Sequence, residues 1–243
     1  MTTTTSDVRG AALAEPAPPH RDRRRTVLVA VAAAVVLAVV GTWLVAFSSV
    51  FGVRTVEVRG IHVLTADQVR TAADIGNGTP LVRLDTAAIT RRVEQLSEVE
   101  SAQVSTSFPS TVVILVEERI AVGFVRRGTH VRLVDHTGAE FRTVDEPPAG
   151  LPHFVLPTGD EQRSTAAAVA AVAASLPASL AGQVRSIQAL NATRITLVLT
   201  RQRLVQWGSA ERTADKAVLL PALLRRSVGY VDLTDPDRPL TRR

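Results

Sequence analysis

The chain has 243 residues, a formal net charge of +5 and no cysteine. Without a thiol it has no disulfide, no thiolate metal ligand and no cysteine nucleophile, so packing alone must hold its core. The mild positive charge does not point to nucleic acid, and the length suffices for a tail, a membrane span and one or two modest domains.

The first 25 residues contain almost no large apolar side chains and are rich in threonine, alanine and proline. Such a segment cannot bury enough surface to offset the entropy cost of ordering. We therefore expect residues 1–25 to form a disordered cytoplasmic tail.

A long apolar segment follows, and it contains no charged residue from Thr26 to Phe47. As a helix it would be about 33 Å long, against a hydrocarbon core of about 30 Å. Four arginines in residues 20–25 place its start in the cytoplasm, and Trp43 and Phe47 suit the opposite headgroup layer. The sequence predicts one transmembrane helix over residues 26–48, with everything after it outside the cytoplasm.

A cleaved signal peptide is the alternative, because Ala46, Phe47 and Ser48 form a passable cleavage site. The apolar region of a signal peptide usually has about 7 to 15 residues. This one is longer and follows a long hydrophilic leader, which favours an uncleaved anchor.

Residues 49–119 show the pattern of a small domain in the order β-α-α-β-β. Valines alternate up to Gly60, Thr65 and Gln68 have capping-box spacing, and Asp85 can cap a second helix. Two strand-like runs follow, over residues 99–107 and 111–118. The second is rich in β-branched residues and is the expected central strand of a three-stranded sheet that carries both helices on one face. The expected core or sheet positions are Val53, Val56, Val58, Val113 and Leu115.

Residues 120–243 predict a mostly antiparallel sheet with one or two flanking helices. Residues 130–141 read as a hairpin with Asp135 to Gly138 at its tip. The alanine-rich run 164–176 is helical by propensity and too short to span a membrane. The remaining expected elements are strands at 184–190, 194–200 and 204–207, a helix at 213–226 and a final strand at 228–234. The whole fold class is therefore α+β, with an N-terminal span.

The sequence contains no motif that is typical of a catalytic or metal-binding site. The five histidines are scattered, and His130, Asp135 and His136 read as hairpin-turn residues rather than a site. No nucleophile elbow or phosphate-binding glycine loop occurs, and adjacent Glu117 and Glu118 would point to opposite faces of a strand. We predict a non-catalytic chain with no cofactor and no metal.

The order of elements and a set of short motifs resemble the FtsQ/DivIB family of bacterial cell division proteins, which carry a POTRA domain. These motifs are Val56-x-Val58-x-Gly60, Leu84-Asp85, Phe108-Pro109, Glu118-Arg119, Leu133-Val-Asp-x-x-Gly138, Leu151-Pro152, Trp207-Gly208, Lys216 and Tyr230-Val-Asp232. The resemblance covers nearly all of the chain from the span onward. Two departures are Ile120, where the family commonly has proline, and Pro221, which lies inside the expected last helix.

The resemblance implies a bitopic scaffold of the division machinery, located in the cytoplasmic membrane at the septum. It implies small coiled-coil partners of the FtsB/DivIC and FtsL type, and docking of other division proteins on the POTRA domain. The alternative from a different class is a membrane-anchored extracytoplasmic enzyme or ligand sensor without a recognisable motif. A secretion or outer-membrane assembly factor is disfavoured, since such proteins usually carry several POTRA copies.

The final predicted strand is the expected partner-binding site. The prolines of residues 235–239 cannot extend a sheet ladder, so this strand is expected to be an edge open to β-augmentation. The candidate partner-binding residues are Tyr230, Val231, Asp232, Leu233, Arg225, Arg226 and Lys216. Val231 and Leu233 should share one face, with Tyr230 and Asp232 on the other. The alternative is that Tyr230 is a half-buried ring and Lys216 a solvated helix residue.

Overall fold

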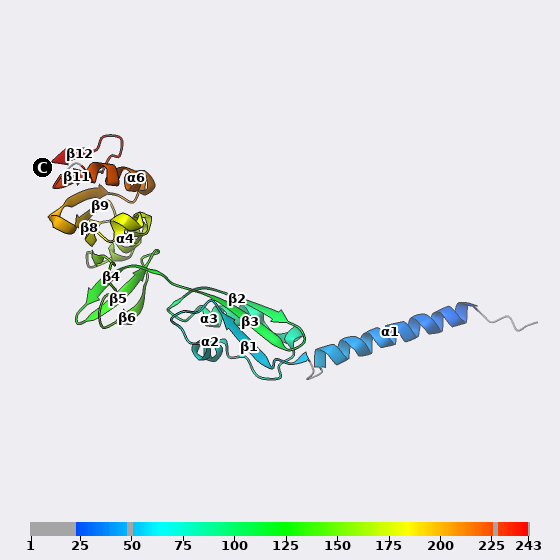
Figure 1. Cartoon of the computed structure of the whole chain (residues 1–243). Helices are drawn as coiled ribbons and strands as arrows, with labels where there is room; N and C mark the ends of the chain where they lie inside the picture. Colours follow the sequence, from blue (N-terminus) through cyan, green and yellow to red (C-terminus); the bar gives the residue numbers. More distant parts are fainter. Residues whose placement is uncertain (1–22, 48–50, 226–227, 243) are drawn as a thin grey trace, which may run out of the picture.

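The computed structural model describes residues 23–47, 51–225 and 228–242 (Figure 1). A long helix, a unit with a three-stranded sheet and a unit with a larger sheet follow one another in a row. We call residues 51–118 the small unit and residues 121–242 the large unit. Most of the expected tail, residues 1–22, lies outside the described residues.

Helix α1 (Arg23–Phe47) is the expected apolar span. Residues 24–41 are long and apolar enough to cross a membrane by length and composition, and none of this segment is buried against the protein. A helix that is apolar on every side is typical of a protein core or of a membrane span, and the exposure of residues 24–41 favours the span. The side chains of Trp43 and Phe47, and residue Ser48, lie outside what the structure describes.

The small unit has the predicted order of strands and helices. Its elements are β1 (Thr55–Arg59), α2 (Ala66–Ala73), the 3₁₀ turn η2 (Leu81–Arg83), α3 (Thr86–Val93), β2 (Val99–Ser107) and β3 (Thr111–Glu118). The sheet order is β1-β3-β2, with β1 parallel and β2 antiparallel to β3. The prediction that residues 111–118 form the central strand is confirmed.

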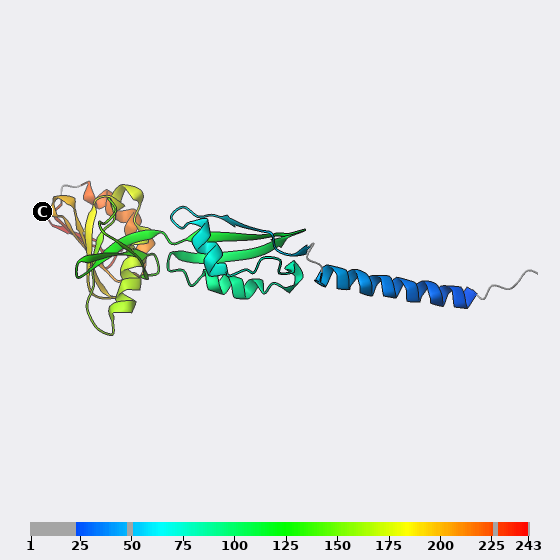
Figure 2. The ribbon, with the colours of Figure 1, turned by 90° about the horizontal axis from the view of Figure 1, so that it is seen from below.

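Local capping signals place the two helices of the small unit. Thr65 and Gln68 form a complete capping box, and the Asp85 side chain accepts a hydrogen bond of 2.9 Å from Ala88 N–H. Figure 2 shows both helices on one face of the sheet. The core lies between these helices and the sheet. It consists of Val53, Leu64, Val69, Ala73, Leu81, Ile89, Val93, Val99, Ala102, Val112, Ile114 and Val116.

The core face of β3 consists of Val112, Ile114 and Val116, while Val113 is half-buried and Leu115 is exposed. Of the five expected core or sheet positions, Val53 is core, Val56 and Val58 pack at its margin, and the last two are sheet positions on the opposite face. Alternation along the strand accounts for this split.

The large unit is a mixed sheet with helices, in the order β12-β11-β10-β9-β8-β7-β4-β5-β6. Five of its eight neighbouring pairs are antiparallel, and β4–β7, β7–β8 and β10–β11 are parallel. Its strands are β4 (Ala121–Arg127), β5 (His130–Asp135), β6 (Glu140–Val144), β7 (His153–Val155), β8 (Val184–Asn191), β9 (Arg194–Leu199), β10 (Leu204–Gly208), β11 (Tyr230–Asp232) and β12 (Leu240–Arg242). Its helices are α4 (Gln162–Ser175), α5 (Ala178–Ala181), the 3₁₀ turn η3 (Thr200–Gln202) and α6 (Thr213–Leu224).

Trp207 and Phe154 are the largest fully buried rings of the large unit. Trp207 Nε1–H donates a hydrogen bond of 2.9 Å to Thr213 Oγ1, which joins β10 to the start of α6. Phe154 fills the space beside Gly123, where a Cβ would come within 2.2 Å of the ring. Helix α6 runs through Pro221 and ends at Leu224.

Two residues, Arg119 and Ile120, connect the small unit to the large unit. The Glu118 carboxylate accepts hydrogen bonds from three backbone N–H groups of residues 62–64, at 2.8 to 3.1 Å. Arg119 N–H donates to the Glu98 carbonyl at 2.8 Å, and its guanidinium pairs with Asp135, which is completely buried. Glu118 therefore binds the end of β3 to residues 62–64 within the small unit, and Arg119 binds the large unit through Asp135.

We expect Ile114→Ala to destabilise the small unit by about 2–5 kcal/mol, because it leaves a cavity under α2 and α3. Leu115→Ala is the matched control on the exposed face of the same strand, and it should cost less than about 1 kcal/mol. Denaturant unfolding of the full chain in detergent, followed by circular dichroism, measures both. Equal losses for the two variants would contradict the assigned core face.

Acid should weaken the junction through Asp135. Burial alone would raise the pKa of this carboxyl, but hydrogen bonds from Thr137, Arg119 and Ala139 outweigh it and hold the pKa below its ordinary value. Since the folded pKa is depressed, the contribution to stability is present above about pH 4 and is lost as the pH falls through the folded pKa.

Asp135→Asn should therefore cost about 1–3 kcal/mol at neutral pH and flatten the loss of stability below about pH 4. Thermal unfolding of both proteins across this pH range is the measurement. An unchanged acid slope in the variant would show that the buried carboxylate does not carry the pH dependence.

Candidate partner-binding edge of the large sheet

The large sheet has β12 as the edge strand at one side and β6 at the other, and the prediction that residues 228–234 form an edge is wrong. Within the described residues β11 has a neighbour on each side, β10 and β12, whereas β12 pairs with β11 alone. The prolines of residues 235–239 do end β11, as expected, but the chain turns there and returns as one more antiparallel strand.

An ion pair holds this turn in place. Arg212, just before α6, donates to both carboxylate oxygens of Asp237 at 2.6 and 3.0 Å, and to Asp215 at 3.0 Å. Inside the turn, Arg238 N–H donates to the Asp235 carbonyl at 3.2 Å. A bidentate pair fixes geometry better than a single contact, so Arg212 positions the return of the chain toward β12.

Two hydrogen bonds identify the backbone groups of β11 that β10 already uses. Leu204 N–H donates to the Gly229 carbonyl at 2.9 Å, and Leu233 N–H donates to the Gln206 carbonyl at 2.8 Å. Backbone groups of successive strand residues point to alternate sides. Val231 therefore faces β10, and the two residues beside it face β12.

The same alternation identifies the free backbone groups of β12. Tyr230 is opposite Arg242 and Asp232 is opposite Leu240, so these four residues use their N–H and C=O groups between the two strands. Thr241 then points its N–H and C=O to the open side. It is the residue on which an added strand would pair.

The predicted alternation of faces along β11 is confirmed. Val231 and Leu233 are fully buried in the core, whereas Tyr230 and Asp232 are half-buried on the other face. The Arg242 guanidinium lies 5.8 Å from the centre of the Tyr230 ring, so the edge strand contributes a cation to that face. Val231 and Leu233 stabilise the sheet and are not available for side-chain contacts.

The basic candidates separate in the structure. Arg225 is exposed at the end of α6, and Arg226 lies outside the described residues. Lys216 is 1% exposed. It is therefore neither a residue that a partner can contact nor a solvated helix residue, the two possibilities that the sequence suggested. Its ammonium donates to the carbonyls of Trp207 and Ser209, at 2.9 and 3.0 Å.

Lys216 therefore ties α6 to the end of β10, beneath the turn that leads to β12. Burial lowers the pKa of its ammonium from the ordinary value, and Glu211 opposes this effect. It is the single lysine of an arginine-rich chain. A lone lysine among so many arginines could have indicated a buried role for Lys216, because a compact ammonium can reach two carbonyls where a planar guanidinium fits poorly.

The sequence interpretation missed Leu240, Thr241 and Arg242, the residues of the true edge. All three are exposed. Their strand is only three residues long and follows two prolines, so no periodicity marks it. The composition of Asp235 to Pro239 could have indicated β12, because such a run is typical of a turn between two strands as well as of the end of a strand.

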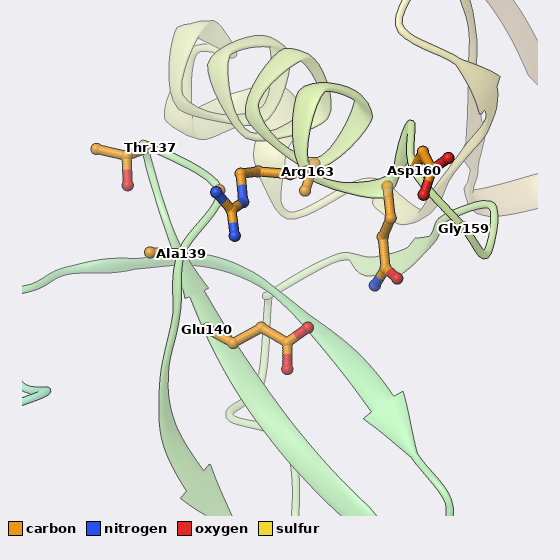
Figure 3. A pocket seen from close by; sticks show the side chains of 9 residues that line it. Thr137, Ala139, Glu140, Gly159, Asp160 and Arg163 are labelled. Atoms are coloured by element: carbon orange, nitrogen blue, oxygen red, sulfur yellow. The ribbon is translucent and has the colours of Figure 1, made fainter.

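A cleft of about 780 Å³ opens between the β5–β6 turn and the start of α4 (Figure 3). Its ionisable lining residues are Glu140, Asp160 and Arg163, and Figure 3 shows Arg163 extending from α4 toward the turn. Glu140 is already paired with Arg127 at 2.6 Å. The lining residues include no serine, cysteine, histidine or lysine, and the part of the chain that the structure describes has no cluster of three or more potential metal ligands.

We expect Lys216→Met to destabilise the large unit by about 1–3 kcal/mol, because the two carbonyls lose their donor. Arg225→Ala removes an exposed charge nearby and should change stability by less than about 0.5 kcal/mol. Calorimetry of the full chain in detergent measures both. A variant at Lys216 that melts like the parent would show that the buried ammonium is dispensable.

Two family models match the chain in sequence. One is described as "POTRA domain, FtsQ-type" and matches residues 51–119, and the other as "Cell division protein FtsQ/DivIB, C-terminal" and matches residues 123–234. Together they cover the small unit and most of the large unit.

Proteins named Cell division protein FtsQ are similar to this chain. That of Mycobacteroides abscessus is 35% identical over 88% of this chain and 69% of its own length, and that of Streptomyces venezuelae is 37% identical over 82% and 77%. That of Mycobacterium tuberculosis strain H37Rv is 34% identical over 95% of this chain and 75% of its own length.

A solved structure of the major extracytoplasmic domain of the trans isomer of DivIB from Geobacillus stearothermophilus aligns over 44% of this chain and 92% of that one. The sequence identity is 18% and the TM-score is 0.36. By the two family models and the similar FtsQ sequences, the chain belongs to the FtsQ/DivIB family of cell division proteins.

Proposed function

We propose that this cell division protein is a bitopic scaffold that recruits and links partners of the FtsB/DivIC and FtsL type at the division septum. The family is non-catalytic, so its role is to hold other proteins. We divide the chain for this role into a cytoplasmic tail (1–25), a span (26–48), a POTRA domain (49–119) and an FtsQ-type β domain (120–243).

The proposed topology follows from charge. Arg23, Arg24 and Arg25 begin α1, and its other end carries no basic residue in the last turn. A cluster of arginines beside a span stays in the cytoplasm. Both units that follow α1 are then outside the cytoplasmic membrane, where the extracytoplasmic parts of other membrane proteins can reach them.

The observation that carries the proposal is the open edge at β12. Thr241 has backbone groups that no described strand uses, and an extended segment of a partner can satisfy them by adding a strand. Leu240, which is 59% exposed, supplies an apolar contact on this edge. The main-chain bonds give affinity and the side chains give specificity.

Side chains beside the edge fit a polar or acidic partner segment. Tyr230 and Asp232 present the half-buried face of β11, Arg242 is exposed on β12, and Arg225 is exposed at the end of α6. Tyrosine and arginine are the residue types that most often dominate binding energy at interfaces. We also propose that other division proteins dock on the POTRA domain, whose outer strands β1 and β2 each pair on one side only within the described residues.

Thr241→Pro tests the edge directly. Proline removes the outward N–H of Thr241, is tolerated in edge strands and leaves the pairing with β11 in place. We expect binding of a partner's extracytoplasmic peptide to weaken at least about tenfold, while the melting temperature changes little. Titration of the full chain in detergent with a labelled peptide measures the affinity.

Thr241→Ala is the matched control, since it keeps the N–H and removes only the hydroxyl, and it should bind like the parent. A chain that ends at Pro239 lacks β12 and should lose binding. Parental affinity in both Thr241→Pro and the shortened chain would reject the edge and make the POTRA face the leading candidate.

A further inference from the structure

Three loops of the small unit meet at the end of the sheet where β1 begins. Val53 N–H donates to the Thr79 carbonyl and Arg54 N–H donates to the Ser110 carbonyl, each at 2.9 Å. These bonds hold the segment after α1 against the loop before η2 and against the β2–β3 turn. We call Phe51 and Arg54 of the first segment, Val82 and Arg83 of η2, and Phe108 of the β2–β3 turn the proximal rim.

The proximal rim combines exposed apolar side chains with basic ones. Phe108 is 59% and Val82 is 52% exposed, and the half-buried Phe51 ring lies 6.3 Å from the Phe108 ring, centre to centre. Arg54 and Arg83 of the rim are exposed as well. A single exposed apolar residue is ordinary, but several apolar and aromatic side chains together with arginines match the composition of surfaces that lie on membranes.

Chain length places this rim close to the membrane. Helix α1 has 25 residues, which corresponds to about 37 Å, whereas a bilayer with its headgroups is about 40–45 Å thick. If α1 starts in the inner headgroup layer, it ends in the outer one. Four peptide links from Phe47 to Phe51 extend at most about 14 Å, and Figure 2 shows the end of α1 beside this end of the sheet.

We propose that the proximal rim rests on the anionic headgroup layer of the membrane that α1 spans. Phe108 and Val82 enter the boundary between headgroups and acyl chains, and the two arginines lie near lipid phosphates. The short tether makes this contact intramolecular, so even weak affinity for lipid suffices. The proposal relies on α1 being a span, but not on partner binding at β12.

Because the chain lacks cysteine, single labels test the contact cleanly. The full chain carries Val82→Cys with an environment-sensitive fluorophore, in vesicles that contain phosphatidylglycerol and lipids with a nitroxide near the headgroup. Ile120→Cys is the matched position, 75% exposed and just past the far end of β3, roughly 30 Å from the start of that strand. Quenching should be at least about twofold stronger at position 82 than at position 120, as burial by about 5–10 Å requires.

A second change separates lipid contact from mere proximity. With the label at position 82, Phe108→Asp should reduce the quenching, whereas Leu115→Asp, also exposed but on β3, should not. Replacing phosphatidylglycerol by phosphatidylcholine should also reduce it. Equal quenching at positions 82 and 120, no effect of Phe108→Asp, or shielding of position 82 only after a partner protein is added would each overturn the proposal.

A label at Val35→Cys, in the middle of α1, tests the span itself. Lipids with a nitroxide deep in the acyl chain should quench it. Quenching at position 35 without quenching at position 82 overturns the lipid contact and leaves the proposed topology standing. No quenching at position 35 overturns both.

Discussion

The ion pair between Arg119 and the buried Asp135 is the contact on which the arrangement of the molecule depends. Strand β3 passes into β4 through two residues, and beside this ion pair the described contacts between the units include His136 Nε2 with Glu100 Oε1 at 3.8 Å. Asp135 also organises its own hairpin turn, since it accepts hydrogen bonds from Thr137 and Ala139. One carboxylate therefore stabilises both the hairpin turn and the junction between the units. Through this junction it helps to set the orientation of β12 relative to the small unit.

Around β11 and β12, polar groups position the backbone and apolar groups stabilise the fold. Trp207, Val231 and Leu233 are buried and fix where β10 and β11 lie. Lys216 then binds the carbonyls at the end of β10, and Arg212 binds Asp237 in the turn before β12. Substitutions in these polar anchors would affect a partner through the position of the edge and not through contact with it.

Local patterns predicted much of the fold, and long-range contacts account for what they missed. The capping box at Thr65 and the cap at Asp85 need only neighbours in sequence, so the helices of the small unit were predictable. The true edge was not, because the turn before β12 depends on Arg212 meeting Asp237, 25 residues away. Lys216 was predicted to bind a partner, with a solvated helix residue as the alternative, because no local pattern shows that its ammonium donates to the carbonyl of Trp207, nine residues earlier. The alternation of Val231 and Leu233 was predictable because it has the period of a strand.

Amide hydrogen exchange at Thr241 tests most directly whether a partner adds a strand at β12. The full chain in detergent is compared with and without the extracytoplasmic peptide of an FtsB/DivIC-type partner. We expect the Thr241 amide to exchange readily in the free protein and to become protected in the complex, while the amide of Tyr230, already paired, changes little. A saturated complex in which Thr241 exchanges as fast as in the free protein would contradict strand addition at β12.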